Sequence, residues 1–185
     1  TFSYAYSYDA DGHIASKVYD AGNDGVPERA WSYETDDSGR ITHTEQDQDL
    51  DGVADAINTF AYDVDGNLLS EEWDYEADGE VDYIRSTSWV DGQPTEERVD
   101  SDADGTIDRR TTWSYDEVGH LIEAVIDEDD NGGWDLRTTY AWLDCKLETI
   151  EEVDAALVEA RHGQQVRPRR PGQAPVEVAG EAGAG

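Results

Sequence analysis

A fivefold internal repeat of about 27 residues limits what this chain can fold into more than any other feature of the sequence. Its clearest copy runs from Asp47 to Asp55 and reads D-x-D-x-D-G-x-x-D. The same nine-residue frame begins again at Asp20, Asp74, Asp100 and Asp127. Successive copies therefore start 27, 27, 26 and 27 residues apart. The first copy is degraded, because Gly22 stands where its second carboxylate belongs. A fixed period of this length predicts one small structural unit used five times.

A second, shorter signal lies between the acidic frames. It reads Tyr-Asp-x-x-Gly-x-Leu/Ile and begins at Tyr8, Tyr62 and Tyr115, with weaker copies at 36–41 and 91–94. Its glycines keep the spacing of the acidic frames and are Gly12, Gly39, Gly66, Gly92 and Gly119. Glycine at a fixed place in a short polar segment is typical of a tight turn. The repeat unit is therefore predicted to be turn, short segment, acidic loop, short segment.

The segments between turns and loops are six to eight residues long, and their aromatic residues alternate with polar ones. Period two with aromatic and Thr enrichment predicts β-strands, and strands joined by short loops pair antiparallel. We therefore predict an all-β fold, an antiparallel up-and-down meander of about 11 strands built from five hairpin repeats. The expected strands are 3–8, 13–19, 28–34, 40–46, 56–62, 67–73, 83–89, 94–99, 109–115, 120–126 and 136–142.

This meander has a geometric consequence. All tight turns should lie along one edge of the sheet and all acidic loops along the other, and the aromatic side chains should stack on one face as cross-strand neighbours. A second apolar row is expected two residues after the turn glycines, at Ile14, Ile41, Leu68 and Leu121.

The repeat pattern ends after Trp142. Leu147, Ile150 and Val153 follow at helical spacing with acids between them, which predicts an amphipathic helix over 146–162 that caps the last strand. Residues 1–145 are thus expected to form the β-hairpin repeat array. Residues 163–185 are rich in Pro, Gly and Ala and are expected to be a disordered tail, with Arg161, Arg167, Arg169 and Arg170 giving this end a local positive charge.

The net charge of the chain limits the kinds of partner that it can bind. With 45 acids against 13 Lys and Arg, the net charge is −32, which argues against binding to nucleic acid or to anionic membranes. No segment has the length and apolarity of a transmembrane helix, so we expect no membrane insertion. Six Trp and 10 Tyr argue for a folded chain. The single Cys145 cannot form an internal disulfide, so bound metal would be an alternative staple in a secreted protein.

The acidic frames carry the ligands that calcium prefers. Ca²⁺ takes about six to eight oxygen ligands, whereas Mg²⁺ keeps its waters and Zn²⁺ favours clustered His and Cys. In the clearest copy, the Val53 backbone carbonyl would add to the four Asp side chains, and waters or a neighbouring acid would complete the shell. The predicted ligands are Asp20, Asp24, Glu28, Asp47, Asp49, Asp51, Val53, Asp55, Asp74, Glu76, Asp78, Asp82, Asp100, Asp102, Asp104, Asp108, Asp127, Asp129, Asn131 and Asp135. Two alternatives remain open: solubilising Asp/Gly turns without metal, and the general acidity of a halophile protein.

Two resemblances follow from these motifs. The turn signature at Tyr8, Tyr62 and Tyr115 resembles the YD repeats of RHS-type proteins over roughly residues 4–142. That resemblance implies β-hairpins that spiral into a shell or a cell-surface assembly. The acidic frames resemble the calcium loops of thrombospondin type-3 repeats, dockerins and EF-hands, which implies Ca²⁺ as the bound ion.

Three functional hypotheses follow. The first is a non-enzymatic, calcium-binding β-repeat module of a secreted or cell-surface protein, with a structural, adhesion or assembly role and with surface proteins or glycans as partners. The second is a carbohydrate-binding module that uses the aromatic face, including Trp113 and Trp142. The third is a hydrolase with a dispersed acid pair, although no carboxylate pair stands out in the sequence. We expect no enzymatic activity.

Overall fold

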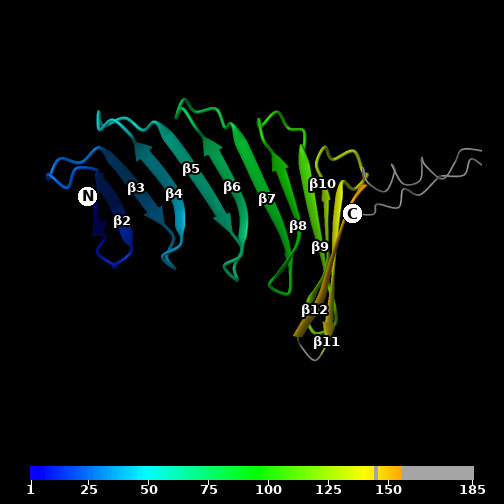
Figure 1. Ribbon diagram of the computed structural model, residues 1–185. Helices are drawn as coiled ribbons and strands as arrows, with labels where there is room; N and C mark the ends of the chain where they lie inside the picture. Colours follow the sequence, from blue (N-terminus) through cyan, green and yellow to red (C-terminus); the bar gives the residue numbers. More distant parts are fainter. Residues whose placement is uncertain (144–145, 156–185) are drawn as a thin grey trace, which may run out of the picture.

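The chain forms one 12-stranded antiparallel sheet in which every strand pairs with its neighbours in sequence. The structure is a computed structural model, and it describes residues 1–143 and 146–155. Figure 1 shows the strands side by side, with the tight turns along the lower edge and the acidic loops along the upper edge. The predicted up-and-down meander is confirmed, with one strand more than the sequence suggested. The strands are β1 Ser3–Tyr8, β2 Ile14–Asp20, β3 Arg29–Thr35, β4 Ile41–Asp47, β5 Ala56–Tyr62, β6 Leu68–Asp74, β7 Tyr83–Val90, β8 Gln93–Asp100, β9 Arg109–Tyr115, β10 Leu121–Asp127, β11 Leu136–Leu143 and β12 Lys146–Asp154.

The tight turns are built around an aspartate side chain. At the turn between β5 and β6, Asp63 Oδ1 accepts the backbone N–H groups of Asp65 at 2.9 Å and Asn67 at 2.8 Å, and Gly66 has a φ of 94°. Asp9, Asp36 and Asp116 accept the equivalent bonds in their own turns. An Asp side chain that mimics a backbone turn favours this tight reversal.

The turn between β7 and β8 differs from the others. Only Asp91 and Gly92 separate the two strands, and both have positive φ angles, 52° and 77°. Positive φ at both central residues is the geometry of a two-residue hairpin turn. From the start of β7 to the end of β8 this hairpin spans 18 residues, one fewer than the 19 of the β5–β6 hairpin, which explains the single 26-residue interval in the repeat.

Long and short strand ladders alternate along the sheet. Across the tight turn, β1 and β2 share six paired positions and β11 and β12 share eight. Across each acidic loop only four positions pair, as in β2 with β3 and β10 with β11. The two strands of one hairpin are therefore joined by more paired positions than two successive hairpins are.

One face of the sheet carries the aromatic side chains. Lys17 lies between two of them, with its Nζ 3.7 Å from the ring centre of Trp31 and 5.6 Å from that of Tyr4. Near the turn edge, the last aromatic side chain of a hairpin's first strand reaches back to the previous hairpin. The Tyr62 hydroxyl donates to the Ile41 carbonyl oxygen at 3.0 Å, and the Trp89 indole N–H donates to the Leu68 carbonyl oxygen at 2.8 Å. The aromatic face thus links successive repeats.

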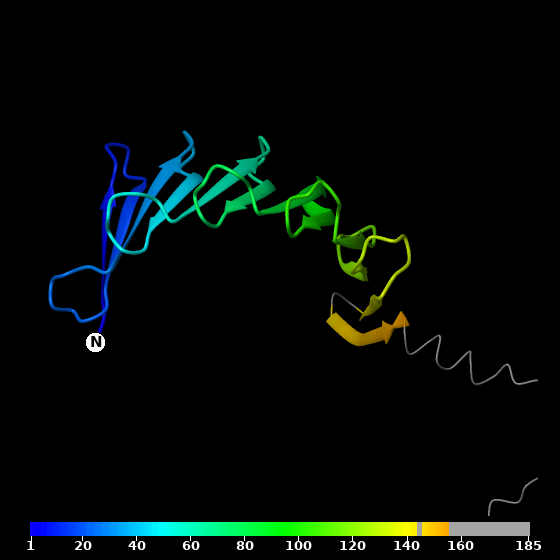
Figure 2. The same cartoon turned by 90° about the horizontal axis from the view of Figure 1, so that it is seen from above.

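The sheet has a single layer and a thin core. In the described part of the chain, Val99 is the one buried hydrophobic side chain. Cross-strand ion pairs such as Arg109 with Glu97, at 3.2 Å, lie on the sheet surface. Figure 2 shows that the sheet twists and bends along its length, with no second layer against either face of the described strands. Stability must therefore come mainly from strand pairing and from side chains that are half-buried between strands.

The predicted helix over 146–162 is wrong where the structure describes it, because Lys146–Asp154 is strand β12. A β-bulge explains the misleading spacing. Trp142 pairs with Leu147 and Tyr140 pairs with Ile150, with a register shift between Ala141 and Trp142. The extra residue brings two positions three apart onto one face, which imitates a helical period. Residues 156–162, the predicted tail 163–185 and Cys145 lie outside the described residues.

Candidate metal centre

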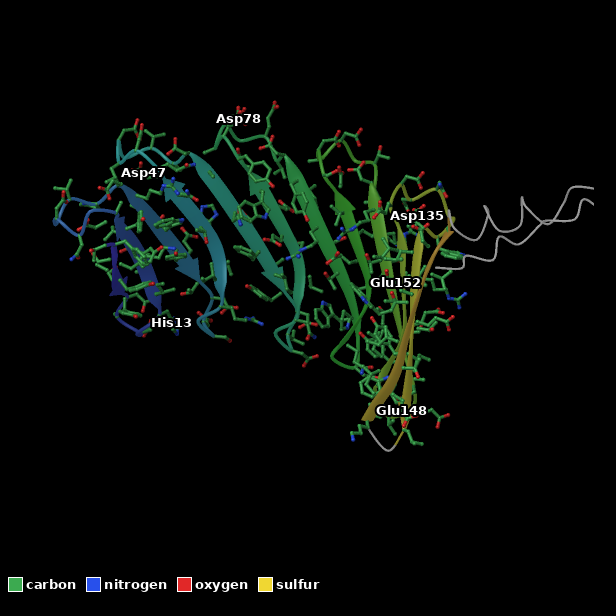
Figure 3. The ribbon with its side chains drawn as sticks, viewed as in Figure 1. His13, Asp47, Asp78, Asp135, Glu148 and Glu152 are labelled. Atoms are coloured by element: carbon green, nitrogen blue, oxygen red, sulfur yellow. The ribbon has the colours of Figure 1, made fainter. Side chains whose placement is uncertain are left out.

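Five acidic loops of eight residues follow β2, β4, β6, β8 and β10 and occupy one edge of the sheet (Figure 3). The loops share one backbone shape. Their third residue is not glycine but has a positive φ, between 46° and 63°. Their fifth residue is glycine, with φ between 88° and 94°. Residues other than glycine can adopt a φ of 46–63° at a cost, so the third loop position tolerates Leu50, Ala77 or Ala103. A φ near 90° is not accessible to them, so the fifth loop position requires glycine.

Carboxylates of the frame hold this shape through backbone hydrogen bonds. In the loop at 101–108, the first frame residue, Asp100, accepts the N–H groups of Asp104 at 3.1 Å and Gly105 at 2.9 Å. The last frame residue, Asp108, accepts the N–H of Ser101 at 2.7 Å. Asp104 accepts the N–H of Thr106 at 2.7 Å. The other loops repeat these bonds, except that at 48–55 Asp47 accepts the N–H of Leu50 in place of that of Asp51, so several predicted ligands also shape the loop.

Three of the five loops bring three carboxylates together. In each triad, one oxygen of the first, third and ninth frame residues lies within 4.8 Å of the others. The triads are Asp47 with Asp49 and Asp55, Asp100 with Asp102 and Asp108, and Asp127 with Asp129 and Asp135. Within the described residues, the frames at Asp20 and Asp74 form no such triad, since Gly22 lacks a carboxylate and Glu76 replaces the shorter Asp.

The remaining predicted ligands lie outside the triads. Side chains at the fifth frame position, such as Asp51 and Asn131, accept a backbone N–H two residues further on, at 2.8 and 2.7 Å. Asp24 and Asp78 make the same bond in the two loops without a triad. Glu28 and Asp82 close these two loops by accepting the N–H of Ala21 and Tyr75. Val53 is an exposed loop residue.

In the triads at Asp100 and Asp127, the first residue is buried and the other two are exposed. Asp100 is 4% exposed and Asp127 is 7% exposed. At Asp108, hydrogen bonds from the hydroxyl and then the backbone N–H of Ser101 lower the pKa of the carboxyl group. A carboxylate that stays ionised beside two others concentrates negative charge, which a divalent cation can neutralise.

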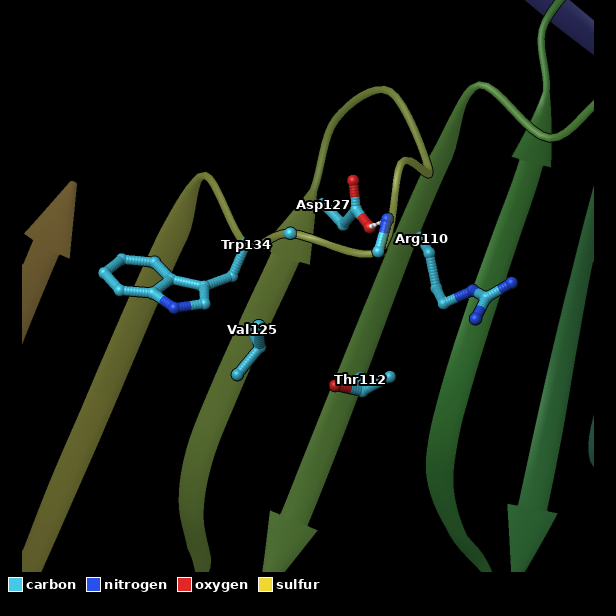
Figure 4. A pocket seen from close by; sticks show the side chains of 7 residues that line it. Arg110, Thr112, Val125, Asp127 and Trp134 are labelled. Carbon is cyan, nitrogen blue, oxygen red and sulfur yellow. Dashed lines mark hydrogen bonds between the residues drawn. The ribbon is translucent and has the colours of Figure 1, made fainter. Parts of the chain in front are cut away.

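A shallow hollow lies beneath the last acidic loop, on the face opposite the aromatic rows. It has a volume of about 250 Å³ and is lined by Arg110, Thr112, Val125, Asp127 and the segment 132–134. Figure 4 shows Trp134 at one side of the hollow and the hydrogen bond from Gly132 to Asp127 at its rim. Arg110 lies close to Asp130, with 3.0 Å between Nε and Oδ1. An equivalent hollow beneath the loop at 48–55 is lined by Ser32, Glu45 and Asp47 among others.

The sequence did not single out two side chains that shape these loops. The Ser101 hydroxyl donates to Asp108, and Arg110 reaches across from β9 to Asp130. Ser101 follows the first frame residue directly, where the other copies carry Ala, Gln, Tyr and Glu, so no repeated pattern marks it. Arg110 lies at the start of a strand, where alternation alone places it on a solvated face.

Comparisons with known proteins bear on the fold alone. No family model matches the sequence, and no curated protein matches it. Among solved structures, the crystal structure of TcdB2-TccC3-TEV superposes with a TM-score of 0.53 at 14% identity, over 84% of this chain and 9% of that one. The Photorhabdus luminescens Tc holotoxin pore with a TccC3-D651A mutation gives 0.49 at 14% identity, over 83% and 9%. The chain thus spans about a tenth of the length of each of these two chains.

The fold is therefore an RHS/YD-like repeat of β-hairpins, as the turn signature suggested. The described part of the chain contains no helix with the length and apolarity needed to cross a bilayer.

Proposed function

We propose that this chain is a non-enzymatic, calcium-binding β-repeat module of a secreted or cell-surface protein, with a structural, adhesion or assembly role. The observation that carries the proposal is the return of one carboxylate triad, at the same three frame positions, in three loops of one sheet edge. Ca²⁺ is the hard cation that suits flexible loops with oxygen ligands, at distances of about 2.3–2.6 Å. Protein partners are in keeping with the toxin complexes named for the structural neighbours.

The proposed role of calcium is to stiffen the loop edge of the sheet. Two carboxylates about 4 Å apart repel each other by roughly 4 kcal/mol at an effective dielectric near 20. A divalent ion reverses this repulsion, so binding and stability should rise together. Each triad spans one acidic loop and hence one short strand ladder, where the sheet is held least firmly. Calcium would thereby strengthen the junction between hairpins at the loop edge, where only four paired positions join the strands.

The alternative is that the acidic residues only shape the loops and bind no metal. A pair of variants distinguishes this alternative from calcium binding. Among the described contacts, Asp102 takes part in no hydrogen bond, whereas Asp104 accepts the Thr106 N–H. Asp102→Asn removes one of the mutually repelling charges and no hydrogen bond, so it should raise the melting temperature in EDTA and weaken calcium binding by calorimetry. Asp104→Ala should instead lower the melting temperature in EDTA, because it removes the hydrogen bond from the Thr106 N–H. If neither calcium heat nor a rise in melting temperature is seen with the parent chain at millimolar calcium, the proposal fails.

The carbohydrate-binding alternative has less support at Trp142, one of its two predicted tryptophans. The indole N–H of Trp142 donates to the Leu121 carbonyl oxygen at 2.7 Å, and its ring stacks on His120. A ring that is stacked and hydrogen-bonded within the sheet has less surface to offer a sugar. Tyr4, Tyr6 and Tyr8, which are about half exposed or more, are the rings of β1 that remain open to solvent on this face. A glycan array with Tyr4→Ala as the control tests this alternative separately from calcium.

A further inference from the structure

The last acidic loop contains a chemically reactive pair of residues. Asn131 is the one asparagine of the chain that is followed by glycine, and the pair lies between β10 and β11. The other asparagines, Asn23, Asn58 and Asn67, are followed by Asp, Thr and Leu. Glycine carries no Cβ, so its backbone nitrogen is open to approach by the preceding side chain. Both residues of the pair are exposed, so water has access to them.

We infer that Asn131 and Gly132 form a spontaneous deamidation site that reacts when the loop at 128–135 opens. The backbone nitrogen of Gly132 attacks Cγ of Asn131, so that a new C–N bond forms and the Cγ–Nδ2 bond breaks. The Gly132 proton leaves with the amide nitrogen as ammonia, and a cyclic succinimide remains. Water then opens this ring at one of its two carbonyl carbons. The net reaction converts an amide and a water into a carboxylate and an ammonium ion, with no other reactant.

Hydrogen bonds of the folded loop engage both reacting groups. The Gly132 N–H donates to Asp127 Oδ2 at 2.9 Å, and Asn131 Oδ1 accepts the Gly133 N–H at 2.7 Å. Ring closure requires both bonds to break. The negative charge of Asp127 also opposes the charge that the Gly132 nitrogen gains when it loses its proton. The closed loop is therefore protected, and the rate of deamidation follows the population of the open loop.

The two possible products fit the loop differently. Opening of the ring at one carbonyl carbon leaves an aspartate at position 131, so that this loop then reads D-x-D-x-D-G-x-x-D, as the loop at 48–55 does. Asp51 of that loop accepts the Val53 N–H at 2.8 Å, so an aspartate in place of Asn131 keeps its bond to Gly133. Opening at the other carbon gives isoaspartate, which adds one carbon to the backbone. Deamidation thus completes the acidic frame in one fraction of molecules and breaks the loop in the other.

Peptide mass spectrometry of the full 185-residue chain, incubated in EDTA at mildly alkaline pH, tests the inference. EDTA makes the result independent of calcium binding. The mass gain that marks an amide converted to an acid should appear at Asn131 and, over the same period, not at Asn23, Asn58 or Asn67. Conversion should be at least about tenfold faster in concentrated urea than in the folded chain, because urea opens the loop.

Two matched variants test whether the loop controls the rate. Asp127→Ala removes the acceptor of the Gly132 N–H and should speed conversion in the folded chain by roughly tenfold. Asp100→Ala removes the equivalent bond to Gly105, one loop earlier, and should leave the rate at Asn131 unchanged. Circular dichroism checks that each variant retains the sheet. The parent chain with and without urea decides the inference even where a variant does not fold.

Several results would overturn the inference. They are no mass gain at Asn131 in urea, an earlier gain at another asparagine, and equal rates in the folded and the urea-treated parent chain. Slower conversion in Asp127→Ala would also overturn it, because Asp127 would then act as a base for the Gly132 nitrogen and not as its protector. An equal acceleration in Asp100→Ala would show that opening of the whole sheet, and not of this loop, sets the rate.

Discussion

The indole N–H of Trp142 donates to the carbonyl oxygen of Leu121 across two hairpins, at 2.7 Å. The same bond joins Tyr62 to Ile41, Trp89 to Leu68 and Tyr115 to Pro94, at 2.8 to 3.0 Å. Each donor is the last or last but one residue of the first strand of its hairpin, and each acceptor is the first or second residue of the second strand of the hairpin before. These bonds form a row that ties successive hairpins along the turn edge.

Removing one bond of this row should cost measurable stability. Tyr115→Phe keeps the ring but deletes the hydroxyl that donates to Pro94, so the free energy of unfolding should fall by about 1 kcal/mol in a urea titration. Tyr140→Phe is the matched control, because the Tyr140 hydroxyl takes part in no hydrogen bond among the described residues. Equal losses for the two variants would show that the bond to Pro94 contributes nothing.

Opposite exchanges of Gly and Ala at two positions in one acidic loop should have different effects on stability. Gly105 has a φ of 90°, and a Cβ there would meet no heavy atom within 4 Å. Gly105→Ala therefore tests backbone strain alone and should cost about 1–2 kcal/mol of unfolding free energy. Ala103, with a φ of 50°, already bears such strain, so Ala103→Gly should be neutral or stabilising by a few tenths. Chemical denaturation in EDTA measures both, and a stable Gly105→Ala variant would contradict the reading.

The turn aspartates predict an acid-sensitive contribution to stability. The side-chain amide of Asn67, followed by its backbone N–H, holds the pKa of Asp63 below the ordinary 3.8. Because the folded state binds this proton less tightly than the unfolded chain, the stabilisation is complete above about pH 4 and is lost as the pH falls through the lowered value. In Asn67→Ala, NMR titration should show the pKa of Asp63 rising toward 3.8. The pKa of Asp9, which is lowered chiefly by the His13 backbone N–H, should not move.

The number of triads predicts the calcium stoichiometry. Calorimetry of the EDTA-treated chain should give three sites rather than five, because the frames at Asp20 and Asp74 form no triad. Glu76→Asp shortens the third-position side chain of the loop at 75–82 to match the loops that do. It should add a fourth site, whereas Glu80→Asp in the same loop should add none. A fitted stoichiometry of five for the parent chain would show that the full frame, and not the triad, defines the site.

Sequence patterns predicted the meander well because strand period and turn chemistry agree at every repeat. They failed at Lys146–Asp154, where the bulge opposite Trp142 brings Leu147 and Ile150 onto one face and imitates a helix. The acidic frames also predicted where carboxylates gather. They did not predict that Asp104 and its counterparts turn toward backbone N–H groups, nor that Glu76 leaves its loop without a triad, because side-chain reach and direction depend on the folded loop and not on spacing.

Short and long strand ladders alternate along the sheet, since four paired positions join one hairpin to the next and six to eight join the strands of a hairpin. A pull on the two ends of such a chain would not rupture it in one event. The short ladders between hairpins would open first and release whole hairpins, each still folded and connected to the next by its acidic loop. The molecule would lengthen in steps and close again when the tension is removed.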